Sequence, residues 1–70
     1  MRISARNVLK GKVIKVTPGT VNAEVVLEIA PGVNIVAMVT KESAQNLALK
    51  TGSDAYAVIK ASSVMVGVDH

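Results

Sequence analysis

The sequence contains no cysteine, tryptophan or phenylalanine, and it has one tyrosine and one histidine. Without cysteine it can form neither a disulfide framework nor a thiolate metal site. The single histidine, His70, is the last residue of the sequence, where side chains seldom serve as ligands. A transition-metal cation therefore lacks its usual ligands, and we expect no bound metal cation.

The residue combinations of the common catalytic sites are lacking too. The sequence has no Ser-His-Asp set, no cysteine nucleophile and no GxxxxGK[ST] phosphate loop. Glu24 and Glu28 could share a strand face, but the alternation of the segment points both outward. Because an acid–base pair usually needs one carboxyl group whose pKa is raised by burial, we expect no enzyme activity.

Long hydrophobic runs are also missing. No apolar stretch reaches the roughly 18 residues of a membrane-spanning helix. No charged segment followed by an apolar one opens the sequence, as it would in a signal peptide. We expect a soluble cytoplasmic protein without a membrane partner.

What the sequence does have is aliphatic side chains. Half of its 70 residues are hydrophobic, and nearly all of these are Val, Ala, Ile, Leu or Met. The length predicts a single domain over residues 1–70. A chain this short leaves roughly 40% of its unfolded surface exposed as a monomer. The aliphatic excess therefore predicts burial between subunits, and hence an oligomer.

Short alternating segments between turns predict mostly β structure. Alternation predicts a strand with one buried face, formed by Val21, Ala23, Val25, Leu27 and Ile29, and an opposite face with Asn22, Glu24 and Glu28. Pro-Gly pairs at 18–19 and 31–32 predict turns. A shift of the apolar phase near positions 13 and 14 predicts a bulge in the first strand. The predicted strands cover residues 7–17, 21–29, 33–39, 55–60 and 64–68.

One segment changes to a helical period. Ala44, Leu47 and Ala48 have helical spacing, and Thr40 is a suitable N-cap, so residues 40–49 are predicted to contain a short helix. The resulting order, β-β-β-α-β-β, predicts an all-β domain with one short helix. It fits an OB-fold-like five-stranded barrel, in which a helix lies between the third and fourth strands.

The basic residues outnumber the acidic ones and give a net charge of +3. Strand alternation places Lys10 and Lys12 on one face and Lys15 on the other, which is typical of a solvated strand that resists edge pairing. An oligonucleotide-binding barrel needs aromatic platforms for base stacking, and Tyr56 is alone. We therefore expect no nucleic-acid partner.

Hydrogen-bond donors gather at the predicted junctions of the chain. Ser4 and Arg6 precede the first strand, Thr40 and Ser43 begin the helix, and Lys60 ends the fourth strand. Each residue alone has a simple structural role, as a cap or a solvated side chain. Together, hydroxyl groups, helix N–H groups and two cations could bind a small dianion.

The same residues lie in segments that resemble the Mop family of molybdate-binding proteins, the molbindins. The most specific segment is ISARNVLKGKV, residues 3–13, which is similar to the family's SARN-x-L-x-G motif. GTVNAEVVLEI, TKES and AVIKASSVMVGV follow in the family's order and spacing. Val8 departs mildly from the family pattern, in which this position is often polar.

The resemblance implies an OB-like fold that exchanges strands between subunits, forming a homo-hexamer built as a trimer of dimers. It implies oxyanion sites at subunit interfaces, with Thr40 and Ser43 contributed by a neighbouring subunit. It also implies a second site near the molecular threefold axis. The first site would comprise Ser4, Arg6, Thr40, Ser43, Lys60 and the backbone of Ala61, and the second Gly19, Thr20, Val21 and Asn22.

By this resemblance the protein would store molybdate, or the similarly sized tungstate, without any chemical step and without an organic cofactor. Two alternatives remain open at this point. One is a nucleic-acid-binding OB module, whose affinity would fall steeply with salt. The other is a purely structural oligomerisation domain without a ligand.

Overall fold

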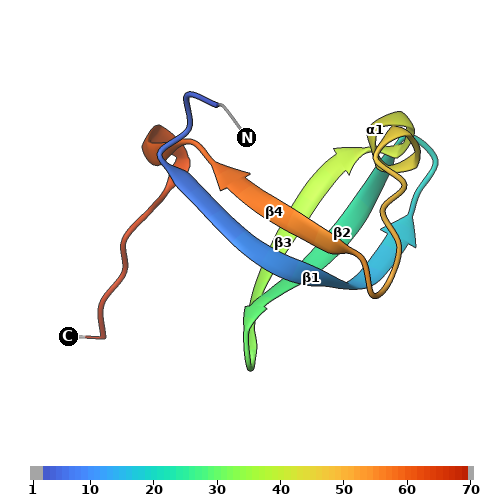
Figure 1. Cartoon of the computed structure of the whole chain (residues 1–70). Coiled ribbons are helices and arrows are strands. Elements are labelled where there is room, and N and C mark those ends of the chain that lie inside the picture. Colours follow the sequence, from blue (N-terminus) through green and yellow to red (C-terminus); the bar gives the residue numbers. More distant parts are fainter. Residues whose placement is uncertain (1–2, 70) are drawn as a thin grey trace.

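The computed structural model describes residues 3–69 and forms a single curled antiparallel sheet with one short helix (Figure 1). The sheet order is β3-β2-β1-β4, so β3 and β4 are its two edges. This confirms the predicted fold class, mostly β with one helix and OB-like. The strands are β1 (Asn7–Pro18), β2 (Asn22–Ala30), β3 (Val33–Thr40) and β4 (Asp54–Ile59), with helix α1 (Lys41–Asn46) and 3-10 helix η1 (Ala61–Ser63).

The predicted bulge in β1 is confirmed, since its register against β2 shifts between Val13 and Lys15. At this point the loop after α1 is tied to β1: the N–H of Gly52 donates to the Val13 carbonyl at 2.7 Å, and the Val13 N–H donates to the Ser53 carbonyl at 2.9 Å. A bulge increases local twist, and here it allows one strand to pair with β2 at one end and with β4 at the other.

The bulge also corrects the prediction for the lysines. Lys12 lies opposite Glu28, and Lys15 lies opposite Val26. Because Glu28 and Val26 are two residues apart on β2 they share a face, and Lys15 therefore lies on the same face as Lys12. The extra residue of the bulge resets the alternation that the sequence pattern had extended through it.

Gly11 is required by the close approach of β1 and β2. A Cβ atom at this position would lie 2.7 Å from the Glu28 carbonyl oxygen and 3.1 Å from Cγ2 of Ile29. Gly11 is the glycine of the SARN-x-L-x-G segment, and its role is therefore one of packing between strands.

The core is small, as expected for this length. Val13, Val25, Leu27 and Ala57 form one buried cluster, lined by partly buried residues that include Leu49 of the loop after α1. Val21 was predicted on this face but precedes β2 and is exposed. The radius of gyration, 12.9 Å, exceeds the about 11 Å expected for a compact chain of this length, which agrees with an open half-barrel.

The prediction of a fifth strand at 64–68 is wrong for the single chain. These residues form no strand, and Figure 1 shows them leading away from the sheet. Met65 and Val66 are more than 90% exposed. A strand needs a partner for its backbone groups, and this segment has none within the described part of its own chain. The described residues thus form four strands.

The helix is shorter than predicted, ending at Asn46 with Leu47 as its C-cap. Ala48, which the pattern placed inside the helix, instead has a positive φ of 53°. That left-handed conformation reverses the chain and brings Leu49 back onto the core, where the Leu49 N–H donates to the Ala44 carbonyl at 3.1 Å.

Candidate functional site

The start of β1 and the end of β4 form the candidate site, because these strands are antiparallel partners. Asn7 lies opposite Ile59 in the register, and its side-chain amide donates a hydrogen bond to the Ile59 carbonyl at 3.2 Å. The residues before Asn7 and those after Ile59 therefore lie side by side. The asparagine of SARN thus anchors the segment that carries Ser4 and Arg6 next to Lys60.

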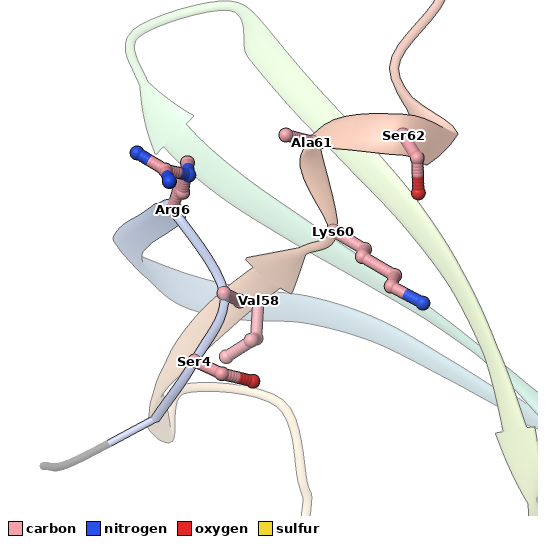
Figure 2. Close-up of a pocket in the computed structure, with 7 residues that line it drawn as sticks. Ser4, Arg6, Val58, Lys60, Ala61 and Ser62 are labelled. Atoms are coloured by element: carbon pink, nitrogen blue, oxygen red, sulfur yellow. The ribbon is translucent and has the colours of Figure 1, made fainter.

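A pocket of about 490 Å³ opens between these two segments (Figure 2). It brings together four of the predicted site residues, Ser4, Arg6, Lys60 and Ala61, which come from opposite ends of the chain. Among the described residues the lining is Ser4, Ala5, Arg6, Val58, Lys60, Ala61 and Ser62.

The chemistry of the lining is that of a hydrogen-bond donor set. Two hydroxyl groups, a guanidinium and an ammonium face or border the pocket, and none of the lining residues is acidic. Among the described residues the one ion pair is Lys12–Asp54, so neither Arg6 nor Lys60 is neutralised by a carboxylate. Such a lining favours an anion, and a dianion would match its two positive charges.

The backbone after Lys60 adds to this set. Two hydrogen bonds close the turn of η1, from the Ser63 N–H to the Lys60 carbonyl at 2.9 Å and from the Val64 N–H to the Ala61 carbonyl at 3.2 Å. These bonds leave the N–H of Ala61 for other partners. The sharp turn also folds Ser62 back to the pocket wall.

Within one chain the pocket is open and does not surround a ligand. A tetrahedral oxyanion, with four oxygens each about the size of a water molecule, occupies on the order of 100 Å³, far less than the pocket. All lining residues except Ala5 are exposed, and in Figure 2 the Arg6 guanidinium extends away from the Lys60 ammonium. One chain supplies donors here but does not enclose a ligand.

Thr40 and Ser43 lie elsewhere in the same chain, at the start of α1. Figure 1 places α1 at the opposite end of the sheet from η1 and the start of β1. Thr40 caps the helix: its Oγ1 accepts from the Ser43 N–H at 3.0 Å and donates to the Ser43 Oγ at 2.8 Å. A single chain thus does not join this pair to the pocket, and its place in the site stays a prediction.

The turn between β1 and β2 contains the predicted second site. The Gly19 N–H donates to the Asn22 carbonyl at 2.7 Å and closes the turn over Thr20 and Val21. The Val21 carbonyl accepts from the Lys41 N–H at 2.8 Å, which ties the turn to the first residue of α1. All four residues from Gly19 to Asn22 are exposed, and their binding role remains a prediction.

Sequence reasoning missed Ala5, Val58 and Ser62 as lining residues. Ser62 follows Lys60 by two positions and reaches the pocket through the turn of η1. The sequence pattern did not indicate this turn and predicted only a strand from residue 64 onward. Val58 was assigned only to its strand. Val58 lies on β4 two residues before Lys60, which follows the strand and still has an extended backbone. Alternation alone could therefore have indicated one face for both side chains.

Comparison with known proteins agrees with this fold and this arrangement of motifs. The TOBE domain family matches residues 3–66. The chain is 49% identical over 69 residues to a probable molybdenum-pterin-binding protein of Haemophilus influenzae, and the match covers 99% of this chain and all of that protein. The chain belongs to the Mop family of TOBE-domain proteins.

Solved structures of Mop proteins share the fold. The structure of MopII from Clostridium pasteurianum in an apo form superposes with a TM-score of 0.89 at 46% identity, covering 96% of this chain and all of that one. A cytoplasmic molybdate-binding protein, ModG, with molybdate bound superposes with a TM-score of 0.92 at 52% identity. The match covers 99% of this Mop chain and 49% of the ModG chain.

Proposed function

We propose that this protein binds molybdate, or tungstate, and stores it in the cytoplasm without transforming it. The observation that supports this most directly is the donor-rich pocket, lined by described residues without a carboxylate, in which Ser4, Arg6, Lys60 and Ala61 meet. Molybdate at neutral pH is a proton-free dianion that accepts hydrogen bonds and donates none. Molybdenum-related names among its Mop relatives and a molybdate-bound structural neighbour support the same ligand.

The charge state of the ligand predicts that phosphate binds more weakly. Monohydrogen phosphate carries a proton that needs an acceptor, and among the described side chains of the lining only the hydroxyl oxygens of Ser4 and Ser62 can accept it, since none is a carboxylate. A donor facing another donor costs affinity. Molybdate, tungstate and sulfate lack that proton, so the site selects proton-free tetrahedral dianions as a class.

We further propose that the pocket is completed in a homo-hexamer, a trimer of dimers, with Thr40 and Ser43 supplied by a neighbouring subunit. Thr40 and Ser43 carry donors but lie at the far end of the sheet from the pocket. Only another copy of the chain could bring such a pair to Arg6. We also propose that the turn from Gly19 to Asn22 forms a second oxyanion site in the same assembly.

Strand exchange would supply the missing fifth strand. An open groove of about 400 Å³ runs between the two sheet edges, and Asp54 is the one charged residue in its lining. Residues 64–68 have the length and the aliphatic character of a strand but no strand partner among residues 3–69, the part of the chain that the structure describes. We propose that this segment from a second subunit occupies the groove. The groove is lined by Val25, Leu27, Ala37, Val39, Leu47, Leu49, Asp54, Ala55, Tyr56 and Val58.

The proposed ligand class is tested by isothermal titration calorimetry with molybdate, tungstate, sulfate and phosphate at fixed salt. We expect molybdate and tungstate to bind with similar affinity, sulfate to bind more weakly and phosphate to bind weakest. Equal binding of phosphate and molybdate would contradict the proposed selection for proton-free anions. A single-stranded oligonucleotide in the same buffer serves as the test for nucleic-acid binding, which we expect to be negligible.

A further inference from the structure

We propose that Val58 sets the size of oxyanion that the pocket prefers, and so separates molybdate from sulfate. This inference rests on the proposed function, because it concerns selectivity within the same pocket. Sulfate and molybdate have the same charge, the same tetrahedral shape and no proton at neutral pH. Hydrogen-bond chemistry alone cannot separate them, and the dimensions of the site have to contribute.

Val58 is the part of the lining that is suited to fix a dimension. It is the one nonpolar side chain larger than a methyl group among the lining residues. Figure 2 shows its side chain extending from β4, the strand that leads to Lys60, towards the segment that carries Ser4. An oxyanion held by donors from both segments would therefore rest against its methyl groups.

The position of Val58 is held by the sheet. It is a residue of β4 and lies opposite Val8 in the register with β1. Its neighbour Ala57 is buried in the core cluster, which prevents β4 from shifting away from the pocket. Valine is also branched at Cβ, which restricts its χ1 rotation.

The donors, by contrast, are carried on adjustable groups. Arg6 and Lys60 have long, exposed side chains, and the hydroxyl group of Ser4 can rotate. Flexible donors can follow anions of different radius, but the methyl groups of Val58 cannot. Because Mo–O bonds are longer than S–O bonds, the donors have to stand further from this fixed wall to hold molybdate than to hold sulfate, so a change in the position of the wall affects the two anions differently.

The test is Val58→Ile, which adds one methylene group to the wall. The dissociation constants are measured by calorimetry. The constant for sulfate divided by the constant for molybdate is then compared between the variant and the wild type. We expect the ratio to fall by about 10-fold, since one methylene group in a fitted pocket changes discrimination by at least that factor. An unchanged ratio in an intact assembly would overturn the proposal.

The matched control is Val36→Ile on edge strand β3, an exposed valine that lies opposite Val26 and outside the pocket lining. This variant should keep the wild-type ratio of dissociation constants. A fall similar to that of Val58→Ile would contradict a specific role of Val58. Since Val58 borders the apolar groove as well, native mass spectrometry should verify that each variant assembles like the wild type.

Val58→Ala provides the opposite perturbation, for the case in which the larger side chain prevents assembly. The smaller side chain should cost sulfate more contact than molybdate and should therefore raise the ratio of the sulfate to the molybdate dissociation constant. A ratio equal to the wild-type value would refute a role in size selection. If the wild-type protein bound no molybdate at all, the proposed function itself would be wrong. If it bound molybdate and both variants kept its ratio, only the role of Val58 would fail.

Discussion

Arg6→Ala is expected to weaken molybdate binding strongly while leaving the ligand-free protein as stable as before. Arg6 is one of two cations in a pocket lining without a carboxylate, so its loss removes half of the charge that faces a dianion. A charge-assisted hydrogen bond contributes about 1.5–3 kcal/mol. The dissociation constant should therefore rise by roughly 10- to 100-fold.

The weaker binding of Arg6→Ala also predicts a smaller rise in melting temperature on adding molybdate. Ligand at 100 times the wild-type dissociation constant stabilises the folded state by about 2.7 kcal/mol. With a constant raised by roughly 30-fold, that concentration is only about three times the new value, and the stabilisation falls to about 0.9 kcal/mol. The rise in melting temperature on adding molybdate should shrink by about two thirds.

The ligand-free melting temperature is the internal control for this variant. Arg6 is exposed and does not take part in the ion pair found among the described residues. Its truncation should therefore remove no stabilising ion pair from the ligand-free protein. Lys50→Ala, which removes a positive charge from the exposed loop after α1, should retain the full molybdate-dependent rise. If Arg6→Ala retained it as well, the ligand would have to bind elsewhere, and the turn from Gly19 to Asn22 would be examined first.

Three further predictions concern the fold. Gly11→Ala should lower the free energy of unfolding by about 1–3 kcal/mol in chemical denaturation at fixed protein concentration, because its Cβ would press on the Glu28 carbonyl oxygen at 2.7 Å; an unchanged midpoint would contradict the close approach. Ala48→Gly should raise the melting temperature slightly, since relief of a positive φ of 53° gains about 1–2 kcal/mol and the added freedom of the unfolded chain costs about 0.4–1 kcal/mol; a decrease would show that the strain is absent. The Lys12 ammonium, 3.1 Å from Asp54 Oδ1, lowers the Asp54 pKa below 3.8, first by its hydrogen bond and then by its charge, with Lys10 adding a smaller effect. Lys12→Gln should therefore raise that pKa toward 3.8 in a carbon-detected NMR titration, and the wild-type ion pair should be lost only as the pH falls through the lowered pKa.

Much of the fold could be predicted from the sequence because its local signals agree with one another. Alternation around Ala23, Val25 and Leu27 identified the core face of β2, and all three residues are buried. The phase shift in β1 identified the bulge. The SARN segment and Lys60 were expected at one site, and antiparallel pairing of β1 with β4 brings them to one pocket.

The errors arose where tertiary structure overrides local pattern. Alternation was extended through the bulge, and Lys15 was therefore placed on the wrong face. Residues 64–68 have strand composition, but composition does not say which chain supplies the partner, and a single chain leaves them unpaired. Ser62 reaches the pocket through a 3-10 turn of three residues, which is too short to produce a periodic signal.

The central claim is that the molybdate site is completed between subunits, and native mass spectrometry with and without molybdate tests it most directly. We expect a hexamer at micromolar protein concentration, and an added mass that corresponds to bound molybdate on the hexamer alone. A folded monomer that binds molybdate as tightly as the assembled protein would contradict the account. A hexamer that gained no mass at saturating molybdate would equally contradict it and would leave a purely structural oligomer.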